Sequence, residues 1–146
     1  MSVYTNEMHT QEYEYDFAAD GGAVGVINLS SKAGAHVLPV GAMVKKVSLK
    51  VVTAFTSGGA ATVSWGPTAS ATGYSGTAVA VASLTANASF NGEGNGASLV
   101  FNDVEDSSKE AVVGVANDGD MKLTIAAAAL TAGRAIVNVQ YYNPTA

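Results

Sequence analysis

The sequence predicts an all-β protein, an antiparallel β-sandwich of jelly-roll type, with an immunoglobulin-like arrangement as the alternative. Three observations lead to this prediction. Apolar residues alternate with polar ones over many short segments, as they do in half-buried strands. Residues typical of turns separate these segments at short intervals. No segment has the spacing of an amphipathic helix, and about nine or ten strands can be assigned along the chain.

The composition suits one domain that is packed in an assembly. A length of 146 residues fits a single domain. Charged residues make up only 13% of the chain, so a fully exposed surface would have little charge to keep it soluble. Residues 1–10 are polar and without periodicity, and we expect a flexible N-terminal arm there. Residues 11–146 are then the β-sandwich domain.

The charge balance and residue types exclude several classes of function. The net charge is −5, and every charged side chain in the first 31 residues is acidic, so direct binding of nucleic acid is not expected. No apolar run is long enough to span a membrane, and the N-terminus does not resemble a signal peptide. The chain has no cysteine, which excludes disulfides and thiolate metal sites. We expect synthesis in the cytosol, with no cofactor and no bound metal.

Residues 11–17 are expected to form the first strand, with an aromatic and an acidic face. The alternating residues are Glu12, Tyr13, Glu14, Tyr15, Asp16 and Phe17. One interpretation is an edge strand whose carboxylates discourage aggregation. The other is an acidic stripe that docks a basic partner, to which Glu7 in the arm would add a further carboxylate.

The most regular alternation predicts a long β-hairpin over residues 38–65. Its first strand would bury Val47, Leu49, Val51 and Phe55, because these apolar residues share one face. The sequence Ser-Gly-Gly at residues 57–59 supplies the turn. A further strand is expected before it, over residues 23–29, followed by a loop over residues 30–36.

The second half of the chain predicts shorter strands. Residues 77–84 alternate valine or threonine with alanine, which predicts a strand with a small-residue face. The Asp-Gly pair at residues 118–119 predicts a hairpin between strands at residues 111–116 and 121–126. A loop over residues 126–129 and a closing strand over residues 135–142 complete a second long hairpin.

No group of residues predicts catalysis. His9 and His36 lack the orienting carboxylate and nucleophile of a catalytic histidine, and no Gly-x-Ser-x-Gly motif is present. Acidic or amide side chains gather in two places that calcium could use, although a solvated loop and a hairpin turn explain them more simply. These residues are Asp103, Glu105, Asp106, Asn117, Asp118 and Asp120.

Aromatic residues suggest a sugar-binding platform, with packing in the core or at a subunit interface as the preferred interpretation. These residues are Trp65, Tyr74, Tyr141 and Tyr142. The platform would make the protein a carbohydrate-binding or receptor-binding β-module of a fibre or surface assembly. A hydrolase that uses Asp103 and Glu105 is a further alternative.

Two segments together resemble small structural proteins of tailed bacteriophages, particularly capsid decoration (cement) proteins. The first is Leu-Pro-Val-Gly-Ala-Met-Val at residues 38–44, leading into a strand that ends in Thr-Ala-Phe. The second is Leu-Thr-Ala-Gly-Arg at residues 130–134, followed by a strand that ends in tyrosine.

The resemblance implies a non-enzymatic virion protein on the outer surface of an icosahedral capsid, synthesised in the host cytoplasm. Its partner would be the major capsid protein, and it would be a homo-oligomer, with a trimer favoured. Such a subunit bridges neighbouring capsid subunits and stabilises the shell. Candidate capsid-docking residues are Glu7, Glu12, Glu14 and Asp16.

Overall fold

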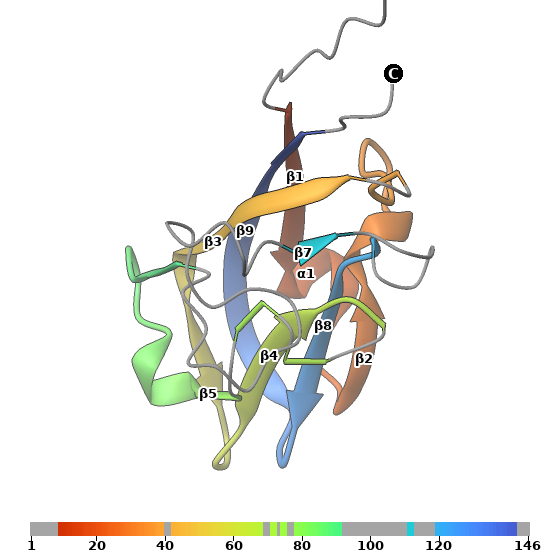
Figure 1. Cartoon of the computed structure of the whole chain (residues 1–146). Helices are drawn as coiled ribbons and strands as arrows, with labels where there is room; N and C mark the ends of the chain where they lie inside the picture. The colour runs from red at the N-terminus through yellow and green to blue at the C-terminus, as the bar shows by residue number, and fades with distance from the viewer. Residues whose placement is uncertain are drawn as a thin grey trace, which may run out of the picture.

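The computed structural model describes residues 9–39, 42–68, 71–72, 74–75, 78–91, 111–112 and 119–142. These residues form two antiparallel β-sheets that face one another (Figure 1). Helical structure in the described residues amounts to the four-residue α1 (Phe17–Asp20) and two 3₁₀ turns, η1 (Leu29–Ser31) and η2 (Val81–Ser83). The prediction of an all-β antiparallel sandwich is confirmed.

The first sheet holds the longest strands and the N-terminal one. Its five strands are β1 (His9–Asp16), β3 (Met43–Ser57), β6 (Ser89–Asn91), β7 (Ala111–Val112) and β9 (Leu130–Tyr142). The spatial order is β1-β9-β3-β6, and β7 also pairs with the start of β3. The strand that includes His9 and Thr10 therefore begins within the segment expected to be an arm, and residues 1–8 lie outside the described residues.

The second sheet is built from shorter strands. These are β2 (Gly25–Asn28), β4 (Thr62–Gly66), β5 (Val79–Ala80) and β8 (Lys122–Ala126). Their order is β2-β8-β4-β5. β1 lies at one end of the first sheet and β2 at one end of the second, so both are edge strands.

The core lies between the sheets and is lined by alternate residues of β1, β3, β8 and β9. On β3 the predicted inward residues Val47, Leu49, Val51 and Phe55 are all buried, with at most 4% of each side chain's surface exposed. Trp65 on β4 is also buried, and its ring meets Phe90 edge-on at 5.7 Å between centroids. Burial of this continuous apolar layer is the main stabilising contribution to the fold.

The predicted hairpin over residues 38–65 is wrong, because its two strands belong to different sheets. β3 pairs with β9, β6 and β7, whereas β4 pairs with β5 and β8. Residues 58–61 carry the chain from one sheet to the other. Alternation specifies which face of a strand is buried, but it does not specify the partner strand.

The two hairpins predicted near the C-terminus fail for the same reason. β8 pairs with β2 and β4 in the second sheet, while β9 pairs with β1 and β3 in the first. β7 pairs with β3 in the first sheet and β8 lies in the second, so these described parts of the predicted Asp-Gly hairpin are not neighbours. Residues 113–118, with the rest of the first predicted strand and Asp118, lie outside the described residues. The expected loop at residues 126–129 is present, and Ala127 turns the chain there with a φ of 72°.

The two sheet-crossing turns, residues 58–61 and 127–129, lie beside one another at the bottom of the view in Figure 1. Ser57 Oγ donates to the carbonyl of Ala129 at 2.6 Å, and the hydroxyls of Thr56 and Thr131 are 2.7 Å apart. β3 and β9 therefore stay paired to the point where both leave the first sheet, and β4 and β8 continue the pairing in the second.

One predicted strand is mostly replaced by a turn. The alternation over residues 77–84 gives only the two-residue β5, and the chain then enters η2. The alanines predicted to form a small-residue face are exposed at positions 78, 80 and 82. The sequence also predicts a strand over residues 97–104, with Leu99 and Phe101 on one face, and this segment lies outside the described residues.

Candidate functional site

β1 carries the acidic stripe at the free edge of the first sheet. Tyr13 and Tyr15 are 1% and 0% exposed, whereas Glu12 on the opposite face is exposed, so the predicted alternation is confirmed for these residues. Phe17, predicted to end the strand, instead begins α1, because Asp16 caps a helical turn there. Each buried phenol donates to a carbonyl at 2.6 Å, Tyr13 to His36 and Tyr15 to Gly21. Burial raises the pKa of Tyr15 to about 12 and raises that of Tyr13 as well.

Most of the stripe's described carboxylates are engaged within the protein. Glu14 accepts a hydrogen bond from Arg134 of β9 at 2.7 Å, and this contact raises the pKa of the arginine. Asp16 caps α1 by accepting from the backbone N–H of Ala18 at 3.1 Å. Glu12 makes no ion pair with any described residue, and Glu7 lies outside the described residues.

Lys32 closes one part of the β1 edge, a role that the sequence did not reveal. Its Nζ donates to the backbone carbonyl of Glu14 and to Asp20 Oδ2, both at 2.7 Å. The same carboxylate oxygen of Asp20 accepts from the backbone N–H of Asp16 at 3.0 Å. The one available signal was that Lys32 is the first cation after an acidic N-terminal stretch, which indicates attraction but no partner.

A hollow of about 330 Å³ lies alongside this edge. Glu12 and Glu14 form its β1 side, and the loop from Lys32 to Ala35 forms the opposite side. Its walls therefore combine two carboxylates with one ammonium group that is already bonded to β1. This arrangement can accept a cationic side chain or an extended segment.

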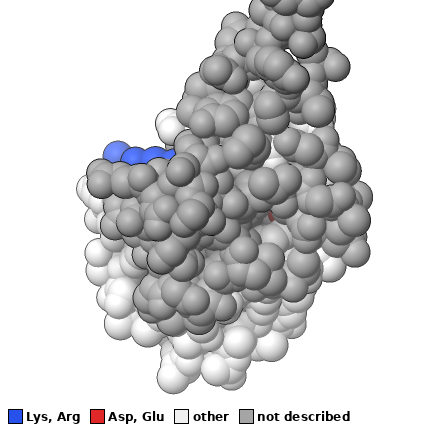
Figure 2. Space-filling model, in the orientation of Figure 1, with Lys and Arg blue, Asp and Glu red and all other residues white. Residues whose placement is uncertain are grey.

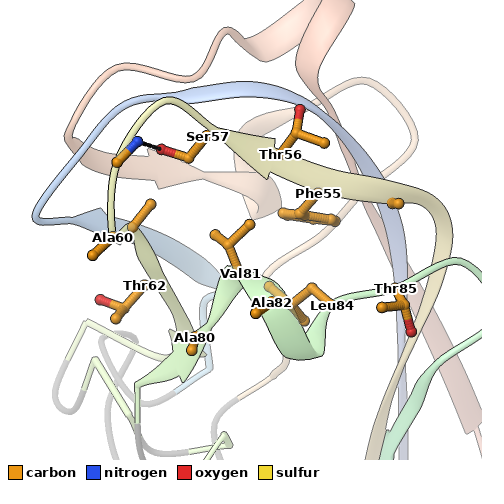
Figure 3. Close-up of a pocket in the computed structure, with 13 residues that line it drawn as sticks. Phe55, Thr56, Ser57, Ala60, Thr62, Ala80, Val81, Ala82, Leu84 and Thr85 are labelled. Atoms are coloured by element: carbon orange, nitrogen blue, oxygen red, sulfur yellow. Dashed lines mark hydrogen bonds between the residues drawn. The ribbon is translucent and has the colours of Figure 1, made fainter.

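A larger, apolar hollow of about 650 Å³ lies where β3 turns into β4 (Figure 3). In Figure 3, Val81 extends from η2 toward the corner, and Phe55 lies on the β3 side. No charged side chain lines it: the residues are Ala54, Phe55, Thr56, Ser57, Gly59, Ala60, Ala61, Thr62, Ala80, Val81, Ala82, Leu84 and Thr85. On the face that Figure 2 shows, the described atoms visible at this end of the molecule are uncharged.

The candidate catalytic and calcium-binding residues that the structure describes make other contacts. No three His, Asp or Glu side chains among them are placed to hold a metal ion. Asp120 instead accepts hydrogen bonds from the backbone and hydroxyl of Thr68. The ring of His9 stacks on the ring of Tyr141 with 5.5 Å between centroids, and the backbone carbonyl of His36 accepts a hydrogen bond from the Tyr13 hydroxyl. The other proposed calcium ligands, residues 103, 105, 106, 117 and 118, lie outside the described part.

The predicted aromatic platform is not formed by its two main candidates. Trp65 is 2% exposed and Tyr74 is 3% exposed, so both belong to the core, as the preferred interpretation held. Tyr141 is partly buried and packs against the core. In the part of the chain that the structure describes, no helix has the length and apolar character to cross a membrane.

Comparison with known proteins gives a match at the level of structure. No protein-family model matches the sequence, and no curated protein matches it. A chain in the solved cyanophage Pam1 capsid asymmetric unit superposes with a TM-score of 0.59, covering 99% of this chain and 89% of its own length at 19% identity. The two chains share a fold.

Two further solved structures are similar at lower scores. The acid-stable capsid of Helicobacter pylori bacteriophage KHP30 contains a chain with 22% identity and a TM-score of 0.48, covering 98% of this chain and 92% of that one. The capsid of Ralstonia phage GP4 contains one with 16% identity and the same TM-score, covering 97% and 87%.

Proposed function

We propose that this protein is a non-enzymatic structural component of a bacteriophage virion, which decorates an icosahedral capsid and stabilises it by bridging neighbouring capsid subunits. The observation that carries the proposal is the fold shared along nearly the whole chain with a chain of the cyanophage Pam1 capsid asymmetric unit. The partner is the major capsid protein, and the protein sits on the outer surface of the capsid as a homo-oligomer, with a trimer favoured.

The surface chemistry of the described residues supports this role. The apolar hollow beside the β3–β4 turn has no charged lining residue, which suits burial against another protein surface. The acidic edge at Glu12 and Glu14 suits a basic partner rather than nucleic acid. Glu7 and Asp16 belong to the same proposed docking surface. Residues 11–146 are the domain, and the arm proposed over residues 1–10 becomes ordered on the capsid in the part that precedes the start of β1 at His9.

The proposal includes a sandwich of the jelly-roll type. Support comes from the connections: β1 to β2, β2 to β3, β3 to β4 and β8 to β9 each pass from one sheet to the other. The first and last strands are neighbours in the first sheet, and β2 and β8 are neighbours in the second. Strands far apart in sequence are thus interleaved in both sheets, as in a jelly roll.

Binding to capsids that lack this protein tests the proposal. Purified protein should sediment with such capsids, add density to their outer surface in cryo-electron microscopy, and raise the temperature at which they rupture. Light scattering on the free protein should give the mass of an oligomer. A protein that leaves capsids unaltered in all these measurements, while folded by circular dichroism, contradicts the proposal.

A further inference from the structure

We infer that the open half of the β1 edge accepts an extended, basic segment of the partner as an added β-strand. The proposed function supplies the identity of that partner as a capsid protein. The site itself is argued from the backbone of β1, the adjacent hollow and the local charge.

The hydrogen bonds at one end of β1 show which of its backbone groups point away from the sheet. In an antiparallel pair, residues alternate between those bonded to the neighbouring strand and those whose N–H and C=O point away from it. The N–H of Asp16 donates to Asp20, and the carbonyl of Glu14 accepts from Lys32, so both residues point away from β9. The period of two places the backbone groups of Thr10 and Glu12 on the same outer edge.

The outer edge is therefore divided into a closed and an open half. Lys32 and Asp20 occupy the Glu14–Asp16 half. In the other half, the only described contact to an outward backbone group is from the half-buried side chain of Gln11, which donates to the carbonyl of Glu12 at 2.9 Å. Open edge groups of this kind pair readily with an incoming strand. Lys32 sets the point at which such a strand must stop.

The hollow next to the edge and the charge of Glu12 determine what kind of segment fits. The hollow of about 330 Å³ runs between Glu12 and Glu14 on β1 and the loop from Lys32 to Ala35. Glu14 is already paired with Arg134, but Glu12 has no ionic partner among the described residues. A strand with lysine or arginine at alternate positions can pair with the backbone and place a cation beside Glu12.

A proline at position 10 tests how much the backbone of β1 contributes to binding of the added strand. Thr10→Pro removes an outward N–H and leaves the bonds to β9, and edge strands tolerate proline at such positions. Thr10→Val is the matched control, because it changes the side chain and keeps the N–H. The probe is a short synthetic peptide in which lysine alternates with threonine and valine. Loss of one hydrogen bond should weaken its binding about tenfold in Thr10→Pro and leave it unchanged in Thr10→Val.

Nuclear magnetic resonance identifies the site and does not depend on the variants. The peptide should protect the amides of Thr10 and Glu12 from hydrogen exchange, and Glu12→Gln should weaken binding. A peptide N-methylated at alternate residues, or one with glutamate in place of lysine, should bind much more weakly. Equal binding of the N-methylated peptide, or protection of amides elsewhere, overturns the inference. So does a change of oligomeric state in Thr10→Pro, which would assign the edge to a second copy of this chain.

The same variants on capsids separate this inference from the proposed function. If Thr10→Pro and Thr10→Val bind capsids equally well, the proposed function stands and the strand-addition inference is wrong. If the wild-type protein binds the peptide at the β1 edge but does not bind capsids, the strand-addition site stands and the proposed function is wrong.

Discussion

Replacing Gly133 by alanine should destabilise the protein through a contact in the β3–β9 pair. Between the pairs Thr53–Arg134 and Thr56–Ala132, β3 has two residues opposite the single residue Gly133. A register of two residues against one is the geometry of a β-bulge, which bends the bulged strand locally. Gly133 has a φ of 149°, and a Cβ atom there would lie 2.8 Å from Cγ of Phe55.

Two costs combine in Gly133→Ala. A non-glycine residue at this positive φ costs about 1–3 kcal/mol. Overpacking against the Phe55 ring costs about 1–3 kcal/mol more. Phe55 is 4% exposed and meets the ring of Tyr15 at 5.5 Å, which limits its movement. Because the ring also borders the apolar hollow, it can move partly into that space, and the expected loss is about 2–4 kcal/mol of unfolding free energy.

Equilibrium unfolding in urea, at one fixed protein concentration, measures this loss. Gly34→Ala separates the backbone cost from the steric one, since Gly34 has a φ of 82° and open space around its Cβ position. It should cost about 1–2 kcal/mol. Gly58→Ala, which also faces open space and has no positive φ, should change stability by less than about 0.5 kcal/mol.

The steric argument fails if Gly133→Ala is no more destabilising than Gly34→Ala. A second test uses Phe55→Leu, which shortens the side chain that the new methyl group meets. In a double-mutant cycle, Gly133→Ala should cost less in the Phe55→Leu background than in the wild type. Additive effects would show that the ring of Phe55 does not resist the substitution.

Three further predictions concern the core, the buried phenols and a turn. Leu123→Ala should lower the unfolding free energy by about 2–5 kcal/mol, because Leu123 is 0% exposed beside Trp65; a loss under about 1 kcal/mol in urea would contradict the assigned core. The pKa of Tyr15 is raised from 10.0 to about 12, so Tyr15 contributes stability that is complete below pH 10 and is lost as pH rises toward 12. Tyr15→Phe should therefore flatten the decline of the unfolding free energy over this pH interval, and an unchanged slope would refute this linkage. Asn28→Ala should cost about 1 kcal/mol in the same urea assay, because the Asn28 amide oxygen accepts from the N–H of Ser30 at 3.1 Å and from its hydroxyl at 2.6 Å; no loss would assign this cap no role.

The buried faces of the strands could be predicted from sequence because alternation is a local property. Val47, Leu49 and Val51 lie two residues apart, so burial of one places the others on the same side. The partner strands could not be predicted in this way. β3 pairs with β9, more than 70 residues later in the chain, as the contact between Ser57 and Ala129 illustrates. Glycines at residues 58–59 are equally suitable for a hairpin and for a turn between sheets.

The candidate site was predictable in its side chains and not in its contacts. The aromatic and acidic faces of β1 follow from the alternation, and Glu12 is exposed as expected. That Lys32 binds the Glu14 carbonyl depends on how the loop after η1 folds back along the strand. The ion pair between Arg134 and Glu14 depends on the register of β1 against β9. This register places Arg134 opposite Asp16, two residues beyond Glu14.

Two properties repeat every two residues in β1: the face on which the side chain lies and the edge to which the backbone N–H and C=O point. Their coincidence makes Glu12 the central residue of the proposed strand-addition site. The burial of Tyr13 and Tyr15 turns the acidic side chains outward. The register against β9 makes these same residues the ones whose N–H and C=O groups point away from the sheet. Lys32 occupies the carbonyl of Glu14, whose carboxylate is paired with Arg134, and Asp20 occupies the N–H of Asp16. Among the three acidic residues in the described structure, Glu12 alone therefore combines an open edge N–H with a carboxylate free of ionic contacts. A partner that recognises this edge therefore meets the backbone and the charge at one residue.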